Sequence, residues 1–302
     1  MSAAEVSITD PQAVPTTWTG RLGAYVALTK PRIIELLLVT TVPAMILAER
    51  GWPGTWLVLA TLVGGTMSAG GANAINNVID RDIDQVMHRT SHRPMATHKV
   101  PPGHALVFGV VLGIGGFAWL WATTNLLAAT LSTAALLFYV FVYTLWLKRS
   151  STQNIVIGGA AGAVPVLVGW AAVSGSLSVA AGVMFAIIFY WTPPHFWALS
   201  LRYREDYARA GIPMLPVVQG EKATVQNIGL YSIQLVALTL VLFPAAEMSL
   251  FYLASAVVLG VGFLWGAWQL RAHPEQAMRF FGYSNVYLTL LFGVIAIDGL
   301  FF

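Results

Sequence analysis

Long apolar segments constrain this 302-residue chain more than any other feature. Nine of them come close to the roughly 20 residues that an α-helix needs to cross a bilayer. None shows the period-2 alternation of a barrel strand. Because lipid offers the backbone no hydrogen bonds, such segments form helices, which pair their own amides and carbonyls. We expect an all-α, polytopic membrane protein with nine transmembrane helices, near residues 33–50, 55–78, 105–123, 126–147, 154–173, 177–199, 226–246, 249–270 and 281–301.

Composition supports a membrane protein and excludes a soluble one. Charged residues make up 10% of the chain and hydrophobic residues 57%, whereas soluble domains carry roughly 25% charge. There is no cysteine, so disulfides and thiolate metal sites are excluded. The first thirty residues lack the apolar core of a signal peptide. We expect a polar N-terminal tail over residues 1–30 and one transmembrane domain over residues 31–302.

Basic residues are distributed unequally between the two sides of this arrangement. With the N-terminus inside, only Arg50 of the 16 lysines and arginines falls on the outer side. The positive-inside rule then predicts a cytoplasmic N-terminus and a C-terminus on the opposite side. A bacterial inner membrane is the expected location, because no clear mitochondrial presequence is visible. The long polar loops near residues 79–104 and 200–225 then lie on the same cytoplasmic face, where they can build one site.

The first of these loops follows a set of polar residues at helical spacing. Asn73, Asn76, Asp80 and Asp84 share one face if the helix continues past the membrane surface, whereas Asp82 points elsewhere. Carboxylates beside a hydrocarbon layer are costly and normally mark function. Oxygen ligands without histidine or cysteine suit Mg²⁺, which leaves coordination sites for a substrate phosphate. The alternative is a solvated helix end with a few ion pairs.

Two arginines follow at the same spacing. Arg89 and Arg93 lie four residues apart, and Pro94 ends any helix there. Guanidinium groups bind phosphate or carboxylate bidentately, so the pair is predicted to hold a diphosphate leaving group or an anionic co-substrate. The alternative explanation is that these residues are basic only because cytoplasmic loops carry an excess of lysine and arginine. We prefer this explanation for Lys99.

The second loop, from Pro193 to Lys222, offers another set of polar residues. Pro193 and Pro194 are expected to break the sixth helix, and such breaks often line cavities. His195 follows at once, either as a satisfied interhelical hydrogen-bonding group or in direct contact with a substrate, including as a metal ligand. The substrate-binding candidates of this loop are His195, Arg202, Tyr203, Asp206, Tyr207 and Lys222.

Aromatic residues gather near the helix ends, among them Tyr139, Tyr143, Tyr190, Trp191 and Trp197. Most are expected to be interfacial or packing residues. One or two that line a cavity could stabilise an allylic cation through the ring face.

Three strings carry a family resemblance: NNVIDRDIDQVMHRTSHRP, WTPPHFWALSLRYREDY and AGIPMLPVV. They resemble the UbiA superfamily of intramembrane aromatic prenyltransferases, and within it the protohaem IX farnesyltransferase (haem O synthase) branch. The resemblance spans residues 21 to 302. It implies a nine-helix bundle around a central cavity, and transfer of a farnesyl group from farnesyl diphosphate to a vinyl group of haem B. The product is haem O, a precursor of haem A, and a direct hand-over to haem A synthase is left open. No nucleic-acid partner is expected.

The resemblance also implies residue roles. Asp80 and Asp84, with Asn76, would hold Mg²⁺ and the diphosphate, while Arg89 and Arg93 would bind phosphate or haem propionates. Asn73 and His195 would belong to the substrate cavity.

One departure from the superfamily pattern lies in the second loop. Many members carry a second D-xxx-D there, but this chain has Tyr203 and Tyr207, with Asp206 adjacent. Whether a second Mg²⁺ binds is therefore left open. Two other functions also remain open: prenylation of a quinone or chlorophyll precursor, and ion-coupled transport. Charges gathered at one surface argue against transport, because transporters bind near the bilayer midplane.

Overall fold

The computed structural model describes residues 17–302, apart from the side chains of residues 32–38. No strand occurs among these residues. The helices are α1 (Trp18–Leu28), α2 (Pro31–Glu49), α3 (Thr55–Ile79), α4 (Arg81–Val86), α5 (Pro102–Thr123), α6 (Leu126–Leu137), η1 (Phe138–Leu147), α7 (Lys148–Ser150), α8 (Asn154–Ser174), α9 (Val179–Arg202), α10 (Arg204–Arg209), α11 (Leu215–Val218), α12 (Gly220–Ala245), α13 (Leu250–Gln269), η2 (Pro274–Gln276) and α14 (Ala277–Phe301).

The predicted all-α membrane architecture is confirmed. Eight helices in the described part are long and apolar enough to cross a membrane, with α6, η1 and α7 counted as one run from Leu126 to Ser150. The remaining predicted span, near residues 33–50, coincides with the 19-residue helix α2. Part of the predicted polar tail is helical, since α1 begins at Trp18, while its first 16 residues lie outside the described chain.

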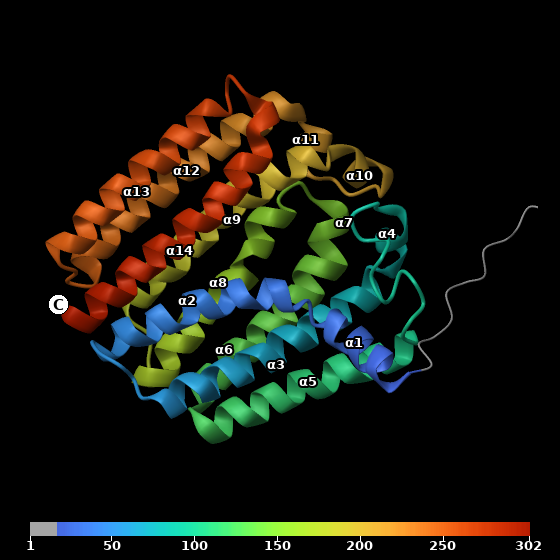
Figure 1. The fold of residues 1–302 in the computed structure, drawn as a ribbon, viewed down its shortest axis with the longest axis horizontal. Helices are drawn as coiled ribbons and strands as arrows, with labels where there is room; N and C mark the ends of the chain where they lie inside the picture. Colours follow the sequence, from blue (N-terminus) through green and yellow to red (C-terminus); the bar gives the residue numbers. More distant parts are fainter. Residues whose placement is uncertain (1–16) are drawn as a thin grey trace, which may run out of the picture.

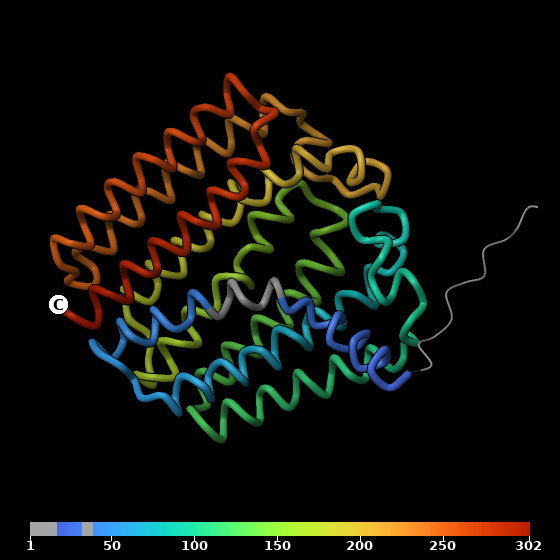
Figure 2. Tube along the Cα trace, in the orientation of Figure 1, coloured from blue at the N-terminus to red at the C-terminus, as the bar shows by residue number. Residues whose placement is uncertain are grey.

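The short helices gather at one end of the bundle. In Figure 1, α1, α4, α10 and α11 lie at the end where α3 and α9 finish, and the C-terminus lies at the opposite end. The trace in Figure 2 shows the loop after α3 beside the loop after α9. The two polar loops therefore share one face of the molecule, as their topology predicts.

Helix α3, which carries the first polar motif, packs against α5 through glycines. A β-carbon at Gly71 would come 2.6 Å from the carbonyl oxygen of Gly109, and one at Gly116 would come 3.0 Å from the amide nitrogen of Ser68. Small residues let helix backbones approach this closely in a membrane. The contact holds the polar end of α3 against a rigid partner.

We expect Gly71→Ala to destabilise the protein by about 1–3 kcal/mol, because the added methyl group meets backbone atoms that can move only with the whole of α5. Thermal unfolding in detergent measures the loss. Gly182→Ala is the matched control, since a β-carbon at this helical glycine meets nothing within 4 Å. Equal melting temperatures for the two variants would contradict the packing argument.

The fourth membrane crossing in chain order, α6 to α7, contains a π-helical segment. This segment, η1, runs from Phe138 to Leu147, and the hydroxyl of Thr144 donates to the carbonyl of Tyr139 at 2.8 Å. The wider turn changes which side chains face inward, and π segments often occur at functional sites. Tyr139, Tyr143 and Lys148 all reach the same cavity from here.

The predicted break at Pro193 and Pro194 is wrong. Helix α9 runs without interruption from Val179 to Arg202, and both prolines are buried. Their missing amides remove two intrahelical donors, but the surrounding helices α8, α12 and α14 hold α9 in register on several sides.

Candidate functional site

A cavity of about 760 Å³ lies within the bundle, a volume typical of small-molecule sites. Most of its wall is apolar, from α3, α6, α8, α9 and α14. Its charged lining residues are Lys30, Asp84, Arg89, Arg93 and Lys148. Of the residues predicted from the sequence, those that line it are Asn73, Asn76, Asp84, Arg89, Arg93, His195 and Tyr207.

The carboxylates lie where α3 gives way to α4. Asp80 stands between the two helices, with φ −87° and ψ 6°, so the predicted continuous helix is wrong at this residue. The amide of Asp84 still donates to the carbonyl of Asp80 at 2.8 Å. This bond preserves the i, i+4 relation across the kink, and Asn76, Asp80 and Asp84 are 2%, 0% and 1% exposed.

Asp80 and Asp84 differ in their access to the cavity. Asp84 lines it, whereas Asp80 lies behind Asn76 and Lys148. The amide of Asn76 donates to Asp80 Oδ2 at 2.8 Å. Asp80 Oδ1 is buried and has no hydrogen-bond partner among the described residues.

Asn76, Asp80 and Asp84 each contact a basic side chain. Lys148 pairs with Asp80, and Arg93 Nη1 donates to the two oxygens of Asp84 at 2.9 and 3.1 Å. Lys30 Nζ donates to Asn76 Oδ1 at 2.6 Å. Lys30 and Lys148 lie 46 and 68 residues from Asn76 and Asp80 along the chain, so the sequence indicates only the side of the membrane on which they lie.

Two asparagines of α3 position Lys30. Asn73 Nδ2 donates to the carbonyl of Thr29, and Asn77 Nδ2 to that of Leu28, both at 3.0 Å. Lys30 itself has φ +54° and ψ +62°. This left-handed conformation is costly for a residue with a β-carbon and tends to persist at functional sites. Asn73 therefore lines the cavity and also anchors the turn that delivers Lys30 to it.

Positive charge is crowded at this end of the cavity. Burial, together with the neighbouring charges of Arg93 and Lys148, lowers the pKa of Lys30 to about 7. Asp84 and Asp80 offset only part of that effect. An anion bound at this end of the cavity would offset the excess positive charge and stabilise the protonated form of Lys30.

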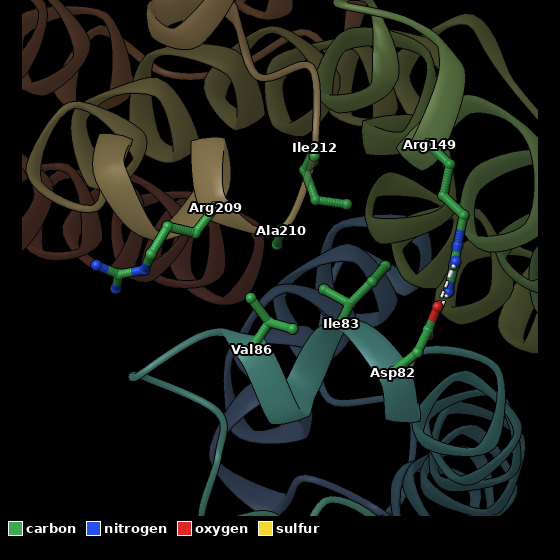
Figure 3. A pocket seen from close by; sticks show the side chains of 8 residues that line it. Asp82, Ile83, Val86, Arg149, Arg209, Ala210 and Ile212 are labelled. Atoms are coloured by element: carbon green, nitrogen blue, oxygen red, sulfur yellow. Dashed lines mark hydrogen bonds and ion pairs between the residues drawn. The ribbon is translucent and has the colours of Figure 1, made fainter.

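Asp82 is separated from the other two carboxylates, in agreement with the helical spacing. Its side chain is 60% exposed and pairs with Arg149 at 2.7 Å. Figure 3 shows this pair at the edge of a second, smaller pocket, lined by Asp82, Ile83 and Val86 of α4, Arg149, and residues 209–212. The Arg149 guanidinium lowers the pKa of Asp82 to about 2.

The loops after α3 and α9 meet through Arg89. Its backbone amide donates to Asp206 Oδ2 at 3.3 Å, and its guanidinium donates to the Tyr207 hydroxyl at 3.1 Å. The guanidinium carbon also lies 5.3 Å from the ring centre of Tyr203 and 5.7 Å from that of Tyr207. Arg89 Nε is buried without a partner among the described residues, which leaves a donor for an anion.

Several predicted residues of the second loop lie outside the cavity. Arg202 and Lys222 are exposed and do not line it, and Asp206 pairs with Arg209. Tyr203 packs against the apolar cluster beneath α4. We do not retain Arg202 and Lys222 as substrate-binding residues, because α9 and α12 present both side chains outward. Arg89 and Arg93 reach the cavity from the loop that follows α4, which ends at Val86.

The family model described as the UbiA prenyltransferase family matches residues 37–291. The chain belongs to that family. This UbiA chain is 57% identical to "Protoheme IX farnesyltransferase 1" of Saccharopolyspora erythraea, over 99% of this chain and 97% of the relative.

Solved structures show the same UbiA fold. A digeranylgeranylglyceryl phosphate synthase aligns with a TM-score of 0.74 at 16% identity, covering 92% of this chain and 98% of its own. A UbiA homolog from Archaeoglobus fulgidus, bound to DMAPP and Mg²⁺, aligns with a TM-score of 0.65 at 16% identity. The alignment covers 90% of this chain and 99% of the homolog.

The residues of this UbiA chain fit a divalent cation. Asp80 Oδ1 is a buried carboxylate oxygen without a hydrogen bond among the described residues, 3.8 Å from Arg149 Nη2, and Lys148 and Arg93 already place positive charge beside both carboxylates. Two carboxylates and an amide oxygen are few ligands, and the described residues contain no group of three or more histidine, cysteine or acidic ligands. That sparse donor set is typical of Mg²⁺, which keeps waters and binds substrate phosphates as well.

Proposed function

We propose that this protein transfers the farnesyl group of farnesyl diphosphate to a vinyl group of haem B. The carbon–oxygen bond to diphosphate breaks, the vinyl carbon bonds to the allylic carbon, and water completes the hydroxyethyl group as a proton leaves. The products are haem O, diphosphate and a proton. The observation that carries the proposal is a cationic, carboxylate-bearing end on an otherwise apolar cavity, in a chain 57% identical to a protohaem IX farnesyltransferase.

The charged end of the cavity is proposed to bind the diphosphate. Asp84, Asp80 and Asn76 would hold Mg²⁺, which neutralises charge on the leaving group when bound. Lys148, beside Asp80, and Arg93, beside Asp84, would each direct a remaining N–H to a phosphate oxygen. Prearranged cations of this kind stabilise charge where it develops, without reorganisation of solvent.

The apolar part of the cavity is proposed to take the prenyl chain and the acceptor. An allylic cation survives only where water is excluded, because water would capture it. Tyr139 and Tyr143 line this cavity with stacked rings whose centres lie 5.3 Å apart. Their faces would stabilise the cation.

Location and partners follow from the same proposal. We place the protein in a bacterial inner membrane, with the N-terminus and both polar loops cytoplasmic and the C-terminus on the other side. The positive-inside distribution supports this orientation, as does the clustering of α4, α10 and α11 at one end. Haem O would be handed to haem A synthase. Residues 31–302 would act as one catalytic domain.

A single assay tests the proposed function. Membranes that contain the protein, supplied with haem B, farnesyl diphosphate and Mg²⁺, are expected to form haem O, detected by chromatography and mass. EDTA is expected to abolish product formation, and excess Mg²⁺ to restore it. A folded preparation that forms no Mg²⁺-dependent product would contradict the proposal.

We expect Tyr139→Leu to lower the rate of farnesyl transfer by roughly ten- to thirtyfold, because a desolvated cation–π contact contributes about 2 kcal/mol. Single-turnover kinetics with both substrates bound measure the chemical step. Tyr139→Phe is the matched control and should stay within a few-fold of wild type, since it keeps the ring face. Equal losses in the two variants would point to the hydroxyl instead.

A further inference from the structure

His195 occupies a fixed position in the cavity wall. The side chain is 6% exposed and lines the cavity from α9. Its ring stacks between Trp191 and Phe281, at centroid distances of 4.2 and 4.3 Å, and meets the edge of Phe196 at 5.2 Å. Because aromatic rings contact both of its faces, the imidazole is held in a fixed orientation.

Hydrogen bonding determines which ring nitrogen carries the proton. The hydroxyl of Ser284 donates to the carbonyl of Phe281 at 2.7 Å, and Ser284 Oγ lies 2.7 Å from His195 Nδ1. A hydroxyl has one hydrogen, so Ser284 must accept at its second contact, and Nδ1–H must donate. Nε2 therefore bears a free lone pair, and it has no hydrogen-bond partner among the described residues.

The surroundings favour a neutral imidazole over a protonated one. No described carboxylate contacts the ring, and its neighbours are aromatic. Protonation would bury an unpaired cation, which is costly. An interhelical hydrogen bond accounts for Nδ1 but not for Nε2. A neutral imidazole whose Nδ1–H is held by a second group is the arrangement that metal-ligating histidines adopt.

We propose that His195 Nε2 is an axial ligand to the iron of the haem acceptor, with Ser284 as its positioning residue. This inference rests on the proposed function, because it takes haem as the acceptor. His195 lies seven residues before the end of α9 at Arg202, or about 10 Å deeper along the helix. The iron is thereby held in the inner part of the cavity, while the charged residues near Asp84 hold the diphosphate.

Haem binding without turnover tests the ligation directly. Purified protein receives ferrous haem B alone, without farnesyl diphosphate or Mg²⁺, and resonance Raman spectra are recorded. The wild type is expected to show an iron–imidazole stretching band that shifts when the histidines carry nitrogen-15. Absence of the band from haem-loaded wild-type protein overturns the inference.

Variants identify the ligand. His195→Gln, which can keep the contact with Ser284, is expected to lose the band, and so is His195→Ala until free imidazole restores it. His104→Ala is the matched control, because His104 is exposed at the start of α5 and its loss should leave the band unchanged. A band that survives unshifted in His195→Gln contradicts the assignment.

Ser284→Ala supplies a readout that does not require a change at His195. The band should persist but move to lower frequency, since the imidazole loses the acceptor on Nδ1. Haem affinity should fall by roughly ten- to hundredfold, the usual loss when an outer-shell partner of a ligating histidine is removed. An unchanged frequency and affinity would count against the inference, even where the His195 variants do not fold.

Failure of this inference is distinguishable from failure of the proposed function. The same wild-type preparation is assayed for haem O formation with Mg²⁺ and farnesyl diphosphate. Product without an iron–imidazole band overturns the ligation alone. A band without product leaves His195 as a haem ligand and overturns the transferase.

Discussion

Asp84→Asn is expected to lower the rate of farnesyl transfer by roughly 10²–10³-fold, the cost of removing one group that stabilises developing charge. Asp84 lines the cavity and is buried, with Arg93 as its ion-pair partner. The amide keeps the shape of the side chain but loses the charge that would hold Mg²⁺. Asp80→Asn is expected to lose a similar factor, because Asp80 Oδ1 is a buried oxygen with no hydrogen bond among the described residues and only the distant Arg149 Nη2, at 3.8 Å, as a counter-charge. Product formation from haem B and farnesyl diphosphate measures both variants.

Asp82→Asn is the matched control for these two changes. Asp82 lies on the same short helix, but it is exposed and pairs with Arg149, and exposed ion pairs contribute only about 0–1 kcal/mol. We expect its activity to stay within about fivefold of wild type on that scale. Magnesium titrations sharpen the test, since Asp80→Asn and Asp84→Asn should need more Mg²⁺ for half-maximal rate. Equal losses at all three positions would rule out the helical face that separates Asp82.

Lys148→Met is expected to lower kcat/KM by about a hundredfold, because the cavity loses one cation that would meet the diphosphate, and Asp80 loses its ion-pair partner. Methionine retains much of the length and apolar stem of lysine, so packing against η1 should be kept. Steady-state kinetics with varied farnesyl diphosphate measure the effect. The Mg²⁺ requirement should change less than in Asp80→Asn, since no oxygen ligand is removed.

Arg149→Met is the neighbouring control. Arg149 is adjacent in sequence and equally charged, but it hydrogen-bonds the exposed Asp82 and the carbonyl of Ile79, and its Nη2 comes no closer than 3.8 Å to Asp80 Oδ1. Its removal is expected to cost no more than about tenfold, as befits a partly exposed ion pair. A larger loss for Arg149→Met than for Lys148→Met would show that the diphosphate approaches from the Asp82 side instead.

Local patterns in the sequence predict most of the architecture. Apolar length identifies the crossings, and the boundaries of α3 and α8 agree with the predicted spans to within a residue or two. The i, i+4 spacing separates Asp82 from Asp80 and Asp84, because backbone hydrogen bonding maintains that relation even through the kink at Asp80. The asymmetry of lysine and arginine places both polar loops on one face.

Contacts between distant segments account for what local patterns miss. Lys30 and Lys148 reach Asn76 and Asp80 across 46 and 68 residues, and no spacing rule connects them. The prolines of α9 predict a break, but packing on several sides keeps the helix intact. Lys222 carries the right charge for an anion, yet α12 presents it to the exterior.

Sequence alone determined that this chain forms a membrane-spanning helical bundle with carboxylates and cations at one surface, because hydrocarbon length and charge asymmetry act on each segment separately. Only the tertiary structure decided which of those charged groups share a cavity. The packing of α3 on α5, the left-handed turn at Lys30 and the π segment η1 aim Asp84, Lys30 and Lys148 at one space. The tautomer of His195 likewise depends on Ser284, 89 residues away, because a hydrogen bond between two helices exists only once they pack.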